Sequence, residues 1–249
     1  MKKQYKALML DLDGTTIPND PDGMPSENVI KAVKKAQQKL AVCIVTGRPL
    51  HIAEHILQVL DITDPVVFLG GSQIIDSVTK KYLYERPLFE KDIPHILTIL
   101  QPYHKQLIID EKKGHSYYSP SHKPSNIFNM LVNHLVETKA DKIIEQLSHI
   151  ETITTHKVIG WKQGEVALNI SHALATKQHA IYEIAKILRI ETHDIIGVGD
   201  GYNDFPLLMA CGLKVAMGNA VVELKAIADY IAPTVEEDGV ADVIEKFIL

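Results

Sequence analysis

Short apolar runs, separated by polar turns and amphipathic segments, open the chain. The runs cover residues 7–10, 41–45 and 66–69, and helices are predicted between them at 27–39 and 49–60. A short continuous apolar run is typical of a strand that is buried on both faces. The order strand, helix, strand, helix, strand therefore predicts a parallel sheet with right-handed crossovers.

The same pattern returns near residue 175 and continues to the end of the chain. Helices are predicted at 176–188, 221–228 and 240–247, and a further helix follows residues 200–204 and ends at about residue 211. Strands are predicted at 195–199, 213–217 and 230–231. The parallel sheet is therefore interrupted once and then completed.

The middle of the chain has a different pattern. A hairpin is expected from 74–76 and 82–84, helices at 91–101, 127–136 and 140–147, and strands at 106–110, 115–119, 151–157 and 165–171. These strands indicate an antiparallel arrangement with one face free to cover something. We therefore predict an α/β chain in which residues 1–80 and 175–249 form a Rossmann-like parallel-sheet core and residues 81–174 form an inserted α+β cap domain.

Composition narrows the classes of partner. The chain has 249 residues, 46% of them hydrophobic, and its 26 basic and 31 acidic residues are interspersed, for a net charge of −5. Without a broad basic face, nucleic acid is not an expected partner. The runs are too short for a secretory segment or a membrane span, and Cys43 and Cys211 have no metal-ligand spacing. We expect a cytoplasmic monomer or homodimer that does not bind membranes.

Two carboxylates end the first strand. Asp11 and Asp13 are two residues apart, so in extended backbone they project from the same face and repel each other unless a cation or a shared proton intervenes. An ordinary Asp-Gly turn at 13–14 is the simpler alternative. The residues that follow the other strands decide between the two.

The carboxyl ends of parallel strands meet at one edge of a sheet. That edge is expected to collect Asp11 and Asp13, residues 46–48 and 70–73, and Asp200 with Asn203 and Asp204. Four acids without an accompanying histidine or cysteine favour Mg²⁺ over Zn²⁺.

The same edge offers what a phosphoryl group needs. Thr46 supplies a hydroxyl, Gly47 a backbone amide, and Lys177 a positive charge that neutralises the phosphoryl oxygens. Asp11 is then suited to act as a nucleophile, because carboxylates form aspartyl-phosphates. Asp13 is placed to protonate the leaving alcohol and afterwards to activate water.

These motifs resemble a known family. Residues 11–15, 46–48, Lys177 and 199–204 match, in order and in kind, the four motifs of the haloacid dehalogenase-like superfamily. The insertion after the third strand, with residues 216–220 and 237–241, is similar to its Cof-like phosphatase group.

The resemblance implies a role for each residue of the motifs. Asp11 would be the nucleophile and a Mg²⁺ ligand, and Asp13 the general acid/base that also offers its backbone carbonyl to the metal. Thr46 and Lys177 would bind the phosphoryl group. Asp200 would ligate Mg²⁺, Asp204 would do so directly or through water, and Asn203 would help to hold Lys177 or the phosphate.

Several residues keep two interpretations. Arg48 either contacts substrate or pairs at the start of a helix, and Gly47 either binds phosphate or only forms a turn. Tyr117, Tyr118, Trp161 and Lys162 lie in the insertion and could face the ester, although aromatic residues in antiparallel strands more often pack.

We therefore expect a Mg²⁺-dependent phosphatase that acts on a small phosphate ester, a sugar or polyol phosphate, through an aspartyl-phosphate. A phosphomutase on the same scaffold and a non-catalytic phospho-ligand-binding protein are the alternatives. Loss of Asp11, Asp13, Lys177 or Asp200 would favour the binding protein, and none of them is lost.

Overall fold

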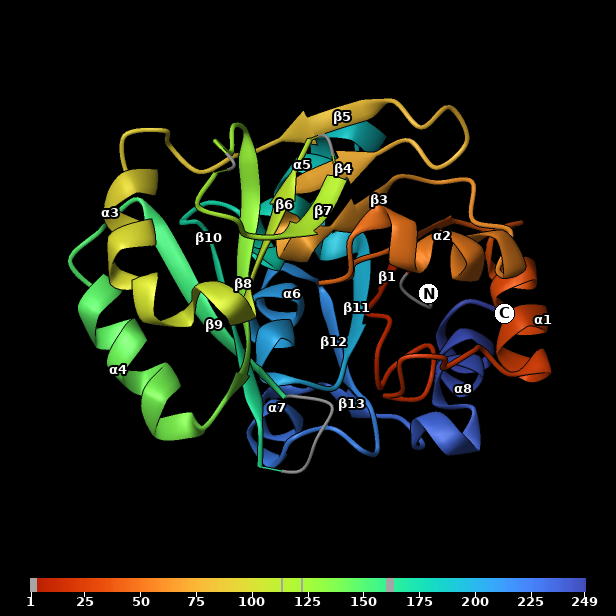
Figure 1. Cartoon of the computed structure of the whole chain (residues 1–249). Coiled ribbons are helices and arrows are strands. Elements are labelled where there is room, and N and C mark those ends of the chain that lie inside the picture. The colour runs from red at the N-terminus through yellow and green to blue at the C-terminus, as the bar shows by residue number, and fades with distance from the viewer. Residues whose placement is uncertain (1–3, 113, 122, 160–163) are drawn as a thin grey trace. The chain divides into compact units, whose positions relative to one another are not determined.

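The computed structural model describes residues 4–112, 114–121, 123–159 and 164–249. The chain divides into two compact units (Figure 1). Unit 1 comprises Met1–Tyr84 and Thr176–Leu249, and unit 2 comprises Glu85–Ala175. None of the helices in the described part of the chain is both long and apolar enough to cross a membrane.

A five-stranded parallel sheet forms the centre of unit 1. Its order is β13-β12-β11-β1-β2, from strands β1 (Ala7–Leu10), β2 (Ala41–Ile44), β11 (Ile195–Gly199), β12 (Leu213–Ala216) and β13 (Tyr230–Ile231). Every residue of β1 is buried, as expected for a strand with neighbours on both edges and helices on both faces. The strands that were predicted on both sides of the insertion therefore do form one sheet.

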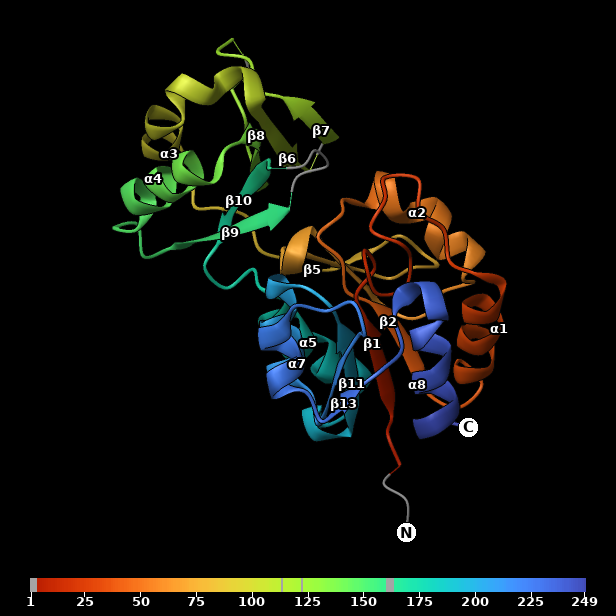
Figure 2. The ribbon, with the colours of Figure 1, turned by 90° about the horizontal axis from the view of Figure 1, so that it is seen from below.

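Helices cover both faces of this sheet. Figure 2 shows α1 (Glu27–Ala36) and α8 (Gly239–Phe247) on one face, and α5 (Lys177–Leu188) and α7 (Val222–Ile227) on the other. The remaining helices of unit 1 are α2 (Leu50–Val59) and α6 (Phe205–Ala210). Helix α1 begins where the Ser26 side chain accepts a hydrogen bond from the Val29 backbone amide.

The third predicted strand departs from the expected parallel pairing. Strand β3 (Val66–Phe68) pairs antiparallel with β4 (Gln73–Ile75), and β5 (Tyr82–Glu85) completes this three-stranded sheet. A parallel bridge, Val45 to Val67, joins β3 to the chain that follows β2. The tight turn after β3, in which Gly70 has a positive φ of 66°, reverses the chain at once and supplies β3 with a hairpin partner.

Unit 2 is a five-stranded antiparallel sheet with two helices. The strand order is β7-β6-β8-β10-β9, from β6 (Leu107–Glu111), β7 (Gly114–Tyr117), β8 (Ile127–Leu135), β9 (Ile153–Ile159) and β10 (Val166–His172). Helices α3 (Ile93–Ile99) and α4 (Glu137–Leu147) share a hydrophobic core with one face of this sheet. Members of that core include Ile96, Ile109, Met130, Ile143 and Ile170.

The helix predicted at 127–136 is wrong, because this segment is strand β8. β8 is the central strand and pairs with both β6 and β10. Most of its residues are buried, so it lacks the alternation that marks a half-exposed strand, and an unbroken apolar run does not distinguish helix from strand. Pairing with the two neighbouring strands, β6 and β10, makes this segment a strand.

The aromatic residues considered for the insertion divide between the surface and the core. Tyr117 is 65% exposed, whereas Tyr118 packs against the core of unit 2. Trp161 and Lys162 lie outside the described residues.

Candidate active site

The ends of three neighbouring strands bring the predicted site residues to one edge of the sheet. Leu10, the last residue of β1, lies opposite both Ile44 of β2 and Val198 of β11. Asp11, Thr46 and Asp200 follow these strands, so they emerge at the same edge although 189 positions separate the first from the last.

Lys177 joins two buried carboxylates at this edge. Its Nζ donates hydrogen bonds to Asp11 Oδ1 at 2.5 Å and to Asp204 Oδ1 at 2.6 Å. The side chains of Lys177, Asp11 and Asp204 are 2%, 7% and 0% exposed. Lys177 is the first residue of α5, where the helix dipole disfavours a positive charge. The two carboxylates, not the helix, therefore account for its position.

Asp204 is held by three hydrogen bonds within the protein. Besides the bond from Lys177, its Oδ2 accepts the backbone amides of Asp200 at 3.0 Å and Gly201 at 2.9 Å. Asp204 therefore fixes both Lys177 and the loop that carries Asp200.

Asp200 lies beside the turn that follows β1. Thr15 donates its hydroxyl to Asp200 Oδ1 at 3.0 Å. Gly14 has a φ of 74°, and a Cβ at this position would collide with the Asp200 carboxylate. The Asp-Gly turn that was the simpler interpretation of residues 13–14 is present, and it serves to bring the two acidic segments together.

One oxygen from each of Asp11, Asp200 and Asp204 lies within 4.8 Å of the others. These oxygen donors suit a hard divalent cation such as Mg²⁺. A second observation supports the fit. Two buried carboxylates, those of Asp11 and Asp204, share one buried lysine, Lys177, so their negative charge exceeds its positive charge. A cation would balance the remaining negative charge.

Burial and mutual repulsion control the protonation of this cluster. Burial first, and then the carboxylate of Asp204, raise the pKa of Asp11 well above its ordinary value, and Lys177 opposes them. The same two causes, burial and Asp204, raise the pKa of Asp200 to about 7. Burial lowers the pKa of Lys177, but Asp11 and Asp204 more than compensate, so the net shift is upward. Lys177 is therefore charged at neutral pH.

Asp13 is separate from this cluster and pairs with Arg48. The Arg48 Nε lies 3.0 Å from both carboxylate oxygens of Asp13, and its Nη2 lies 2.5 Å from Oδ1. The same guanidinium donates to the backbone carbonyl of Asp20 at 3.1 Å. The partner of Arg48 in the structure is thus the predicted general acid/base.

The other predicted phosphate-binding residues lie in the surrounding loops. Thr46 is buried, and its Oγ1 accepts the Arg48 backbone amide at 3.0 Å. Space is open within 4 Å of the position of a Cβ at Gly47. Asn203 is half-buried in the turn Tyr202–Asp204, and in the described part of the chain the hydrogen bonds of Lys177 go to Asp11 and Asp204 instead.

A family model of haloacid dehalogenase-like hydrolases matches residues 8–132 and 119–244. The chain belongs to the haloacid dehalogenase-like hydrolases. This hydrolase is similar to a 5-amino-6-(5-phospho-D-ribitylamino)uracil phosphatase of Bacillus subtilis, 28% identical over 98% of this chain and 96% of that protein. A second phosphatase of the same organism is 25% identical over 98% of this chain and 100% of its own length.

The structure comparison agrees with the sequence comparison. A haloacid dehalogenase-like hydrolase from B. subtilis superposes with a TM-score of 0.85 at 22% identity, over 98% of this chain and 100% of that one. Together the comparisons confirm the predicted superfamily, the α/β core with an inserted cap, and the enzyme class, a phosphatase.

Two residues near the site were not assigned roles from the sequence. Thr15 holds Asp200, and Asn219 donates to the Gly14 carbonyl at 2.8 Å while its Oδ1 accepts the Val235 amide at 2.9 Å. Asn219 follows strand β12. Its position after a parallel strand, at the same edge of the sheet, is the feature of the sequence that could have indicated its role.

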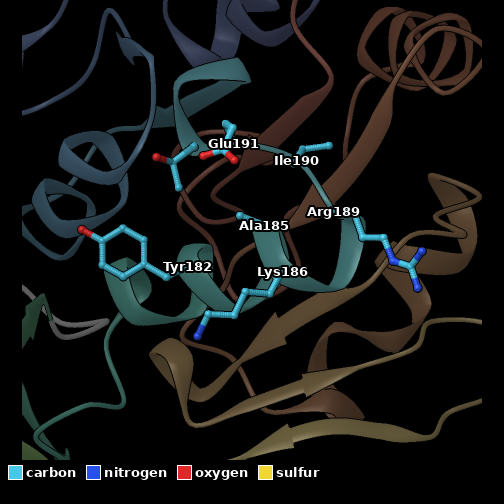
Figure 3. Close-up of a pocket in the computed structure, with 7 residues that line it drawn as sticks. Tyr182, Ala185, Lys186, Arg189, Ile190 and Glu191 are labelled. Carbon is cyan, nitrogen blue, oxygen red and sulfur yellow. The ribbon is translucent and has the colours of Figure 1, made fainter.

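A pocket of about 440 Å³ lies at the other end of α5 from Lys177 (Figure 3). Tyr182, Lys186, Arg189 and Glu191 are among its lining residues. At about 1.5 Å of rise per residue, Lys186 is roughly 14 Å along the helix from Lys177. This pocket therefore contains none of the predicted site residues.

Proposed function

We propose that this hydrolase removes the phosphoryl group from a small phosphorylated metabolite, with Mg²⁺ bound and with Asp11 as the nucleophile. The observation that carries the proposal is the bridge from Lys177 to Asp11 and Asp204, with Asp200 close by. A phosphate ester is a multiply charged anion, and such a site offers it a fixed cation beside a carboxylate able to attack phosphorus.

The reaction has two displacements. In the first, an Asp11 carboxylate oxygen attacks phosphorus, the bond from phosphorus to the leaving oxygen breaks, and Asp13 gives its proton to that oxygen. In the second, Asp13 takes a proton from water, the water oxygen attacks phosphorus, and Asp11 is released as a carboxylate. Lys177 and Thr46 hold the phosphoryl oxygens in both steps.

Arg48 keeps the Asp13 carboxyl in place for these proton transfers. Its guanidinium meets both oxygens of Asp13 and is itself anchored by a backbone carbonyl of the loop that follows. Gly47, with open space around it, is suited to present its backbone amide to the phosphoryl group.

Asp11, the backbone carbonyl of Asp13, Asp200 and Asp204 are the proposed ligands of Mg²⁺. When bound, the metal supplies positive charge that neutralises the phosphoryl oxygens and favours the ionised form of Asp11. Since Asp204 already accepts three hydrogen bonds, we assign it contact with the metal through water.

The proposed substrate class is a sugar or polyol phosphate. The B. subtilis relative is named for a phosphate ester on a ribityl chain, which is a polyol. Unit 2 is the proposed cap, which would exclude water and select the leaving group.

A phosphomutase on the same scaffold is the main rival. It would return the phosphoryl group to substrate, so it would release little inorganic phosphate without a bisphosphate activator. A phospho-ligand-binding protein would bind esters and release none.

The test is a screen of phosphorylated metabolites with Mg²⁺, with inorganic phosphate as the readout. Wild type should release phosphate, Asp11→Asn should not, and chelation of Mg²⁺ should stop the release. Asp61→Asn is a matched control, because Asp61 is exposed and remote in sequence from the motifs. Full activity of Asp11→Asn, or activity that persists after chelation, would refute the proposal.

A further inference from the structure

The loop that follows strand β12, residues 217–221, contacts both acidic segments of the candidate site, and we call it the β12 loop. Asn219 donates its side-chain amide to the carbonyl of Gly14 at 2.8 Å. Two residues later, the backbone amide of Val221 donates to the carbonyl of Asp200 at 3.0 Å. One loop therefore holds both the turn that follows β1 and the residue that follows β11.

The side-chain amide of Asn219 has a partner at each of its two ends. Its Nδ2 faces the carbonyl of Gly14, and its Oδ1 accepts the backbone amide of Val235 at 2.9 Å. A carbonyl on one side and an N–H group on the other fix which end of the amide points to Gly14. Because Asn219 is an exposed residue, these hydrogen bonds, and not burial in the core, hold its side chain in place.

Further hydrogen bonds hold the β12 loop itself. The backbone amide of Gly218 donates to the carbonyl of Pro233 at 3.1 Å, and Nζ of Lys225, on α7, donates to the carbonyl of Gly218 at 2.5 Å. At the start of the loop, the backbone amide of Met217 donates to the carbonyl of Gly199, the last residue of β11, at 3.0 Å. The loop is thus fixed within unit 1, and it fixes in turn the groups that it contacts.

The contact at Gly14 lies between two of the proposed metal ligands. Gly14 is next in sequence to Asp13, whose backbone carbonyl is one of these ligands, and it lies against the carboxylate of Asp200, which is another. Thr15 also donates its hydroxyl to that carboxylate, at 3.0 Å. The turn is therefore tied to Asp200 on one side and to Asn219 on the other. A shift of this turn would change the separation of the two ligands.

We propose that Asn219 is a positioning residue for Mg²⁺, which holds the carbonyl of Asp13 and the carboxylate of Asp200 at the separation that the metal needs. Mg²⁺ demands near-ideal geometry, so donors that are in place before it arrives bind it more tightly than donors that must first be brought together. Asn219 acts through Gly14 and is not itself a ligand. This inference rests on the proposed Mg²⁺-dependent activity, and it assigns Asn219 to metal affinity and not to the chemical step.

The test is a calorimetric titration of the full-length protein with MgCl₂, which measures metal binding without substrate. Asn219→Ala removes both hydrogen bonds of the side chain. Asn219→Asp keeps the shape and the bond from Val235, and it loses the donation to Gly14. Asn28→Ala is the matched control, because Asn28 is also an exposed asparagine whose amide donates, at 2.7 Å, to the carboxylate of Asp238.

The Kd for Mg²⁺ should rise about fivefold in Asn219→Ala, which is the effect of one net hydrogen bond on an equilibrium. Asn219→Asp should also bind Mg²⁺ more weakly than wild type, although its added negative charge would by itself favour a cation. Asn28→Ala should leave the Kd within about twofold of the wild-type value.

Phosphate release from p-nitrophenyl phosphate, measured against Mg²⁺ concentration, provides a second readout. Both variants of Asn219 should need more Mg²⁺ for half of their maximal rate, and saturating Mg²⁺ should restore the release, which also shows that they fold. A rate that saturating Mg²⁺ does not restore would overturn the assignment to metal affinity.

An unchanged Kd in Asn219→Ala would overturn the inference. Weaker binding in Asn219→Ala but not in Asn219→Asp would place the effect in the bond from Val235 and overturn the role of Gly14. If wild type does not bind Mg²⁺, the proposed metal site fails and this inference fails with it. If wild type binds Mg²⁺ but releases phosphate from no ester in the screen, the proposed phosphatase function fails, while weaker binding in both variants would still support the role of Asn219.

Discussion

Arg48 holds the carboxylate of Asp13 with two guanidinium nitrogens, at distances of 2.5–3.0 Å. Arg48 comes from the loop after β2 and Asp13 from the loop after β1, so the ion pair ties two loops of the site together. The Arg48 side chain is 8% exposed and that of Asp13 29%. The pair is thus partly shielded from solvent, and one carboxylate orientation is favoured.

Replacement of Arg48 tests this relationship. Lysine keeps the charge but lacks the planar pair of nitrogens that fixes the orientation of the carboxylate, so Arg48→Lys should lower kcat by about tenfold with little change in KM. The measurement is steady-state release of phosphate. Arg189→Lys, an exposed arginine, should behave as wild type. A rise in KM at constant kcat would instead make Arg48 a substrate contact.

Lys177 should be needed for stability as well as for catalysis. Lys177→Met leaves Asp11 and Asp204 buried without their cation, which should lower the free energy of unfolding by about 3 kcal/mol in the absence of metal. Denaturant unfolding measures this loss. Adding Asp204→Asn to Lys177→Met should recover part of it, and a double variant less stable than Lys177→Met would contradict the role of unpaired charge.

The raised pKa of Asp200 predicts how the stability of the metal-free protein depends on pH. The pKa of Asp200 is about 7 in the folded protein and 3.8 as an ordinary carboxyl. Between these values the folded state holds a proton that the unfolded state lacks, so the contribution of Asp200 to stability falls as pH rises from about 4 to 7.

Thermal unfolding from pH 5 to pH 8 measures this effect. The Tm of wild type should fall relative to that of Asp200→Asn as pH rises, and Mg²⁺ should raise the wild-type Tm more at pH 8 than at pH 5, because protons compete with the metal. Parallel curves for the two proteins would mean that Asp200 is ionised throughout this range.

Gly71 sets the position of Lys177. Its φ is 125°, and a Cβ there would collide with the backbone of Thr176, the residue before Lys177. Gly71→Ala should therefore displace the start of α5 and lower kcat by at least about tenfold. Gly70→Ala is the matched control, since Gly70 also has a positive φ, 66°, but open space around it. Equal effects on kcat would indicate backbone strain alone.

The sequence predicted the strands that carry the chemistry, because buried parallel strands appear as unbroken apolar runs. Strands β1, β2 and β11 were located in this way, and their adjacency follows from the rule that parallel strands share one carboxyl edge. The convergence of Asp11, Asp200 and Lys177 was predicted from those ends together with the family resemblance.

Strand β8 was mispredicted because its deciding contacts are distant in sequence, whereas β3 departs from the prediction because of a local turn. Strand β8 has the apolar content of a buried helix, and only its two neighbours, β6 and β10, specify a strand. Strand β3 was expected in the parallel sheet. It keeps a parallel bridge, Val45 to Val67, to the chain after β2, and the turn at Gly70 makes β4 its antiparallel partner. The partner of Arg48 could not be predicted from the sequence either, because the direction of a side chain in a loop depends on which loop lies opposite.

In the proposed reaction the phosphoryl group is bonded covalently to Asp11 before water removes it. The most direct measurement uses Asp13→Asn and p-nitrophenyl phosphate, whose leaving group needs no proton, so that the intermediate forms but the water that removes it is not activated. After acid quench and borohydride reduction, peptide mass spectrometry should find homoserine at position 11. A burst of nitrophenol with position 11 unmodified, or with another residue reduced, would contradict the account.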